Sequence, residues 1–118
     1  MLEKELSYTI TNGAKEGALI LALDGPFTLG NMFELQSELR TLNSPCLVMD
    51  LSAVPYMDSA GLGVIMNYFV WAQSHGRKFF LTGVSDRIRA LFEMARVDNV
   101  LNVANPLKLP RPSPRWIK

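Results

Sequence analysis

The segment at residues 46–51, which reads CLVMDL, most constrains the fold of this 118-residue chain. Five of its six residues are apolar, and Pro45 directly before it prevents a helix from continuing into it. A short, nearly continuous apolar run of this kind is typical of a strand that is covered on both faces. We therefore expect a strand that is buried inside the domain.

The remaining segments alternate between strand and helix patterns. Apolar residues alternate with polar ones over residues 6–11, Asn12-Gly13 marks a turn, and residues 18–24 form a second apolar run, so the chain is expected to begin with an antiparallel hairpin. Apolar residues spaced by three or four positions predict three helices, at about 31–42, 59–74 and 85–94. Two further strands are expected at 78–82 and 100–103. This order predicts an α/β fold in which a mixed sheet carries a single layer of helices.

The last fourteen residues differ from the rest of the chain. Residues 1–104 carry eight Lys or Arg and eleven Asp or Glu, a net −3, whereas residues 105–118 carry four cations, no acid and four of the seven prolines. Proline fixes φ and lacks a backbone donor, so this segment is expected to be extended. We expect one domain over residues 1–104 and a solvated, basic, Pro-rich tail over residues 105–118.

Composition argues against several classes of protein. The formal net charge of +1 does not suit a nucleic-acid binder, and a single cysteine with a single histidine suits neither a disulfide framework nor a zinc site. No signal peptide and no run of about 18 apolar residues is present, so we expect a cytoplasmic protein without membrane insertion. No cofactor motif is found, since Gly61-Leu62-Gly63 alone is not a nucleotide-binding loop.

A serine hydrolase is the main enzymatic alternative. It would need a base within hydrogen-bond reach of a nucleophilic serine. The only histidine, His75, follows Ser59 by sixteen residues, which is about 24 Å along a helix. We therefore expect no enzymatic activity.

The motif at residues 58–63, DSAGLG, stands where the longest expected helix begins. Asp58 or Ser59 can cap this helix, because a side-chain oxygen accepts N–H groups that the first turn leaves free. Two glycines so early in a helix cost up to about 1 kcal/mol each relative to alanine. We interpret Gly61 and Gly63 as leaving the helix start bare for another surface, and a hydroxyl at such an electropositive end suits a phosphate.

The element order and this motif together resemble the STAS domain, and within it the stand-alone bacterial anti-sigma factor antagonists. The matching stretch, residues 48–63, reads VMDLSAVPYMDSAGLG, and similarity extends to residues 23–25 (LDG) and 89–94 (RALFEM). The resemblance covers about residues 6–104. It implies a STAS-like mixed sheet and a regulatory role without catalysis.

In that family, the serine that matches Ser59 is phosphorylated by a partner that is both a serine protein kinase and an anti-sigma factor. The unmodified antagonist binds this partner and frees a sigma factor, and the phosphorylated form is released. The resemblance therefore implies partner switching controlled by Ser59, with Asp58 beside the acceptor hydroxyl to orient it. The partner-binding residues that it implies are Thr28, Asp58, Ser59, Ala60, Gly61, Leu62 and Gly63.

One departure from the family leaves a second function open. Thr28, in Gly25-Pro26-Phe27-Thr28, stands where many relatives carry an aspartate. The chain could instead be a STAS scaffold in a stress-signalling assembly, or an accessory subunit of a lipid-transport ATPase. It would then dock through the same face without phosphorylation. A homodimer is also left open.

Two apolar features have alternative interpretations. Val64, Tyr68 and Trp71 form a second stripe on the 59–74 helix, which either packs between sheet and helices or faces a partner. Relatives commonly end in another helix, which the prolines of the tail forbid. Either apolar surface is left for a partner, or an extended strap covers it with Leu107, Leu109, Trp116 and Ile117.

Overall fold

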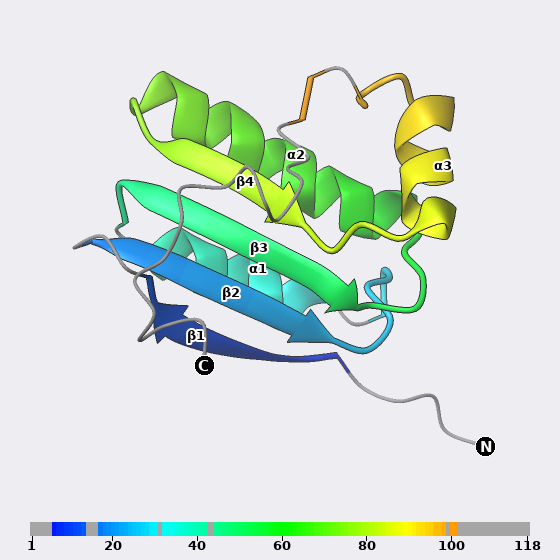
Figure 1. Cartoon of the computed structure of the whole chain (residues 1–118), viewed down its shortest axis with the longest axis horizontal. Helices are drawn as coiled ribbons and strands as arrows, with labels where there is room; N and C mark the ends of the chain where they lie inside the picture. The colour runs from blue at the N-terminus through cyan, green and yellow to red at the C-terminus, as the bar shows by residue number, and fades with distance from the viewer. Residues whose placement is uncertain (1–5, 14–16, 31, 43, 99, 102–118) are drawn as a thin grey trace.

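The computed structural model describes residues 6–13, 17–30, 32–42, 44–98 and 100–101. Strands and helices follow each other as predicted, which confirms the α/β class (Figure 1). The elements are β1 (Ser7–Asn12), β2 (Ala18–Asp24), α1 (Met32–Thr41), β3 (Cys46–Ala53), α2 (Ser59–Ser74), β4 (Lys78–Thr82) and α3 (Asp86–Met94).

Several boundaries differ from the predicted ones, and β1 spans Ser7–Asn12 where residues 6–11 were expected. β3 continues to Ala53, two residues beyond the apolar run, because its backbone still pairs with β2 there. α3 begins at Asp86, since Ser85 is its cap and accepts a hydrogen bond from the N–H of Ile88 (3.2 Å). The strand predicted at 100–103 is not formed at residues 100–101, which lie in a turn, and its remainder lies outside the described residues, as does the tail.

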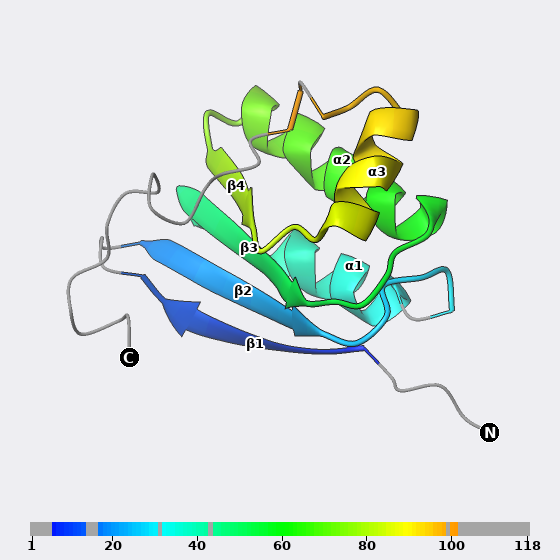
Figure 2. The same ribbon diagram turned by 45° about the vertical axis from the view of Figure 1, so that its right-hand side comes forward.

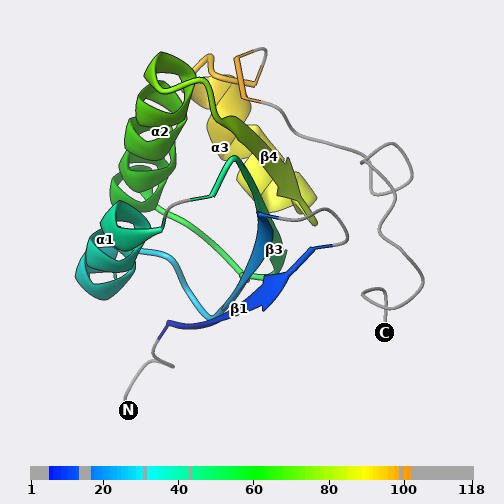
Figure 3. The ribbon, with the colours of Figure 1, turned by 90° about the vertical axis from the view of Figure 1, so that its left-hand side faces the viewer.

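The sheet has the strand order β1-β2-β3-β4, with β1 antiparallel to β2 and the other pairs parallel. Right-handed crossovers that step in one direction across a sheet place their helices on one face. Accordingly, α1 and α2 lie on the same side of the sheet, and α3 lies toward the β4 side (Figures 2 and 3). The predicted single layer of helices is thus α1 and α2.

The core fills the space between this face and the helices. In each strand, alternate residues point toward the helices, and the register places Leu21, Met49 and Leu81 side by side, all fully buried. α1 contributes Leu35, and α2 contributes Ile65, both fully buried. Burial of this apolar area supplies the main stabilisation of the domain.

The second apolar stripe of α2 mostly packs within the chain. Val64 and Tyr68 are buried, whereas Trp71 is 37% exposed and stacks on His75 with 4.4 Å between ring centroids. Packing between neighbouring elements is therefore the correct interpretation for Val64 and Tyr68. Of the stripe, only Trp71 retains substantial exposed area.

The opposite face of the sheet, which we call the helix-free face, is formed by the other set of alternating residues. No helix of the described part of the chain packs on it; in Figure 1 it faces the viewer, and α1 lies behind the sheet. We predicted that the apolar run is covered on both faces. In the described part of the chain, helices cover only one of the two faces. The helix-free face carries Ala18, Ile20, Ala22, Cys46, Val48, Asp50, Lys78, Phe80 and Thr82 from its three parallel strands.

None of the helices described is long and apolar enough to span a membrane.

Candidate functional site

The candidate site lies where the loops after β2 and β3 meet the start of α2 (Figure 2). The N–H of Phe27 donates to the carbonyl of Tyr56 (3.1 Å), and the N–H of Asp58 donates to the carbonyl of Phe27 (3.3 Å). These bonds form a short parallel bridge between Phe27 and Met57. The Phe27 side chain is fully buried, so the two loops are fixed to each other directly beneath the helix start.

Asp58 is the N-cap of α2 and links the helix to the loop after β2. Its backbone is extended, and its Oδ1 accepts hydrogen bonds from the N–H groups of Ala60 and Gly61, both at 3.0 Å. Its Oδ2 accepts a third bond, from the N–H of Leu29 (3.1 Å). Sequence reasoning gave Asp58 the role of orienting the Ser59 hydroxyl. Both carboxylate oxygens accept backbone N–H groups, and the orienting role remains a prediction.

These contacts shift the ionisation of the carboxyl group. Desolvation raises the pKa of Asp58, but the hydrogen bonds from the N–H groups of Gly61, Leu29 and Ala60 favour the charged form more strongly. The net effect holds the pKa of Asp58 below its ordinary value of 3.8. Asp58 is therefore a full negative charge at neutral pH, directly beside Ser59.

We expect Asp58→Ala to lower the free energy of unfolding by about 1 kcal/mol, as is typical for a lost N-cap. Asp58→Asn retains a capping oxygen and should cost less. Because the folded-state pKa is depressed, the contribution of the charge is complete above the unfolded-state pKa and is lost as the pH falls through the folded-state value. Thermal melts at pH 7 and near pH 3 check this: the gap between wild type and Asp58→Asn should shrink at the lower pH, and a constant gap would contradict the role of the charge.

Ser59 is the first residue of α2, and its side chain is exposed. Within the part of the chain that the structure describes, its hydroxyl makes no hydrogen bond. Thr28 is half-buried and directly precedes Leu29, whose N–H donates to Asp58. A partner can therefore reach the hydroxyl without any rearrangement of the chain.

The two glycines of the motif have different roles. A Cβ on Gly61 would lie 2.4 Å from the carbonyl oxygen of Phe27, so Gly61 is needed for packing inside the chain. A Cβ on Gly63 would meet nothing within 4 Å. The interpretation that a glycine leaves the helix start open to another surface therefore applies to Gly63, which is exposed. Gly61 and Leu62 are buried, so they can contribute to a partner site only by supporting the residues above them.

Sequence reasoning missed two exposed apolar side chains near the site. Leu29, whose N–H is bonded to Asp58, is 57% exposed, and Phe33 in the first turn of α1 is 61% exposed. Phe33 lies outside the apolar stripe of α1, and this position in the sequence could have predicted that its side chain is exposed. Exposed large apolar side chains are therefore present on the loop after β2 and on the first turn of α1.

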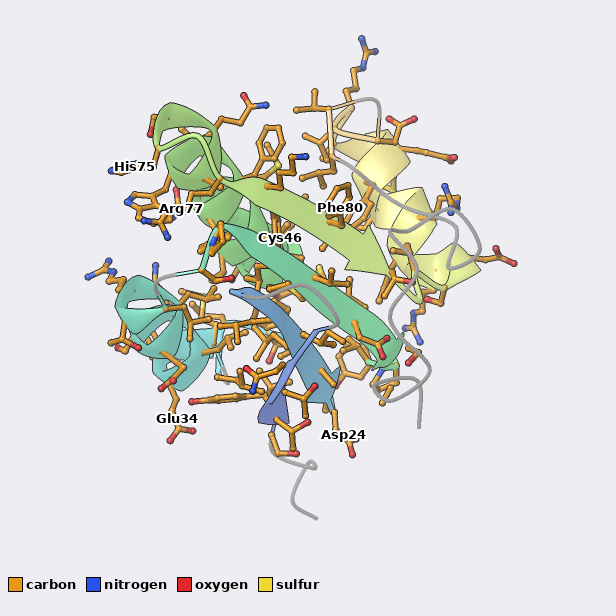
Figure 4. The ribbon with its side chains drawn as sticks, turned by 60° about the vertical axis from the view of Figure 1, so that its left-hand side comes forward. Asp24, Glu34, Cys46, His75, Arg77 and Phe80 are labelled. Atoms are coloured by element: carbon orange, nitrogen blue, oxygen red, sulfur yellow. The ribbon has the colours of Figure 1, made fainter. Side chains whose placement is uncertain are left out.

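Other reactive side chains lie away from Ser59. His75 is at the opposite end of α2, near Arg77, about 24 Å along the helix (Figure 4). Asp50 lies within β3, and its side chain accepts a hydrogen bond from the N–H of Ser52 in the same strand (2.9 Å). In the described ranges, no group of three or more His, Cys, Asp or Glu side chains could hold a metal ion.

Comparison with known proteins gives the same fold and a consistent set of names. The profile of the STAS domain family matches residues 9–108. The anti-sigma-B factor antagonist of Listeria monocytogenes is 37% identical over 59 residues, which cover 50% of this chain and 52% of the relative. The match therefore spans about half the length of that relative.

Solved structures show the fold independently of sequence. A crystal structure of an anti-sigma factor antagonist from Mycobacterium paratuberculosis superposes with a TM-score of 0.76 at 17% identity, over 87% of this chain and 88% of the other. The Bacillus cell fate determinant SpoIIAA, solved in its phosphorylated form, superposes with a TM-score of 0.67 at 12% identity, over 86% and 95% of the two chains.

Proposed function

This chain belongs to the STAS domain family, and from that membership we propose that it is an anti-sigma factor antagonist whose partner is an anti-sigma factor with serine kinase activity. The observation that carries the proposal is the exposed Ser59 hydroxyl at the start of α2, on a backbone that Asp58 holds in place. The partner docks on this end of the domain, and phosphorylation of Ser59 releases it.

The charges at the helix start explain how one phosphate can act as a switch. Phosphorylation adds about −1.5 to −2 charges at neutral pH. A helix N-terminus ordinarily stabilises an added anion by about 0.3–1 kcal/mol. Here Asp58 already accepts from the N–H groups of Ala60 and Gly61, so its charge offsets this gain. The modification therefore changes the fold little and acts on the partner.

At an interface the balance is different, because a charge that becomes buried without a partner group costs several kcal/mol. A loss of only about 2.7 kcal/mol weakens binding a hundredfold. The names of the relatives support the regulatory role, and the phosphorylated SpoIIAA structure supports a phosphate on this fold. Both are properties of those proteins that we extend to this chain as part of the proposal.

The assignment of the phosphorylated residue is tested with Ser59→Ala. The chain is incubated with ATP and each purified anti-sigma factor kinase encoded in the source genome, and its intact mass is measured. Wild type should gain one phosphate, and Ser59→Ala should gain none, because it lacks the acceptor oxygen. Ser74→Ala, at the far end of the same helix, is the matched control and should be phosphorylated as fully as wild type.

Two outcomes would count against the proposal. Stoichiometric phosphorylation of Ser59→Ala would place the phosphate on another residue. Tight binding of a kinase partner with no mass gain on wild type would favour the alternative in which the domain docks as a scaffold or accessory subunit. This alternative is included because Thr28 stands where many members of the family carry an aspartate.

A further inference from the structure

The helix-free face carries an apolar row that the core does not include. Ile20 pairs directly with Val48, and Val48 with Phe80, so their side chains form one row across three strands. The row spans about 10 Å at the usual strand spacing. Val48 is only 9% exposed, yet it and its two neighbours lie outside the hydrophobic core cluster on the other face.

The chain has a segment of suitable length to cover this row. Leu101 is packed in the core, and the segment that ends there lies on the β4 side of the sheet (Figures 1 and 2). Seventeen residues follow Leu101. At about 3.1 Å per residue they can extend roughly 50 Å, whereas the four strands span only about 14 Å from β4 to β1.

The chemistry of residues 105–118 fits the helix-free face. Four prolines prevent a helix and favour an extended segment. Its four apolar side chains match an apolar row. Its charge of +4 opposes the net −3 of residues 1–104.

We propose that residues 105–118 lie as an extended strap across the helix-free face, with their apolar side chains on the row formed by Ile20, Val48 and Phe80. The strap replaces the missing layer on this side of the sheet. It covers the second face of β3, whose apolar run is typical of a strand buried on both sides. This inference concerns the face away from Ser59 and does not depend on the proposed switch.

Tryptophan fluorescence tests the proposal in the full chain. The chain has two tryptophans, so Trp71→Phe leaves Trp116 as the only one. A synthetic peptide of residues 105–118 provides the emission of a solvated Trp116. In the full chain, Trp116 emission should be blue-shifted relative to the peptide, and quenching by acrylamide should be several-fold weaker. Emission and quenching equal to those of the peptide would overturn the proposal.

A second substitution locates the strap. Phe80→Ser removes one end of the row and should shift Trp116 emission toward that of the peptide. Phe33→Ser is the matched control, since Phe33 is exposed on α1 in the other layer, and it should leave the emission unchanged. Ile20→Ser is a second variant in case Phe80→Ser does not fold. If Phe80→Ser and Phe33→Ser changed the Trp116 emission equally, the strap would not lie on the helix-free face, and the proposal would be overturned.

A second copy of the chain is the competing occupant of this face. Light scattering of the full chain, and of the chain without residues 105–118, distinguishes the two. The strap predicts a monomeric full chain, and a shortened chain that associates or binds a hydrophobic dye. A full chain that is dimeric while Trp116 emits as in the peptide would mean that the second copy covers the row, and the proposal would be wrong.

Discussion

Ser59→Asp is expected to weaken binding of the anti-sigma factor kinase by about a hundredfold or more. Ser59 is exposed at the first turn of α2, so an aspartate there is tolerated by the free domain. In the complex, the new carboxylate is buried beside that of Asp58, and such a charge costs several kcal/mol when it lacks a partner. About 2.7 kcal/mol already corresponds to a factor of one hundred in the dissociation constant.

Isothermal titration of the purified kinase into each variant measures this effect. Ser59→Ala should bind within a few-fold of wild type, because it removes only a hydroxyl that makes no hydrogen bond within the described chain. Gln73→Glu adds the same charge at an exposed position near the far end of α2 and should also bind normally. If Ser59→Asp bound as tightly as wild type, the kinase would dock elsewhere on the domain.

The second large effect is expected from Gly61→Ala. The new Cβ would lie 2.4 Å from the carbonyl oxygen of Phe27 and 2.8 Å from Cγ of Met57. The carbonyl cannot move easily, since it accepts a hydrogen bond from Asp58 and the Phe27 ring is fully buried. Overpacking of this kind costs about 1–3 kcal/mol, and each kcal/mol corresponds to roughly 4–8 °C in the melting temperature of a domain of this size.

Gly63→Ala is the matched control for this prediction. Its Cβ would enter open space, so only the better helix propensity of alanine remains, which is worth up to about 1 kcal/mol. Thermal melts of the two variants should therefore change in opposite directions, a fall for Gly61→Ala and a small rise for Gly63→Ala. A fall of equal size in both would mean that the difference in local packing does not determine their stability.

Hydrophobic periodicity was sufficient to predict most of the fold. The strand at Ala18–Asp24 and the helix at Ser59–Ser74 have the boundaries that the apolar pattern indicated, because burial on one side determines both period and length. The capping function of Asp58 was also readable, since it depends only on neighbouring backbone N–H groups. The sequence therefore sufficed where the interactions are local.

The site was less predictable because its contacts join segments that are distant in sequence. Gly61 packs against Phe27, and the carboxylate of Asp58 accepts from the N–H of Leu29, 29 residues away. Nothing local to these residues indicates that the two loops meet. The absence of a described helix over Val48 was also hard to predict from local sequence. It follows from the order of the strands in the sheet, which places α1 and α2 on the same face.

The bond between Asp58 and Leu29 has an evolutionary consequence. The donor to the Asp58 carboxylate is the backbone N–H of Leu29, so this bond does not depend on the side chain at position 29. Residues 28–30 can therefore vary in sequence while Ser59 keeps its position. Under the proposed function, related chains can therefore acquire different partners through changes in this one loop, while the start of α2 stays as it is.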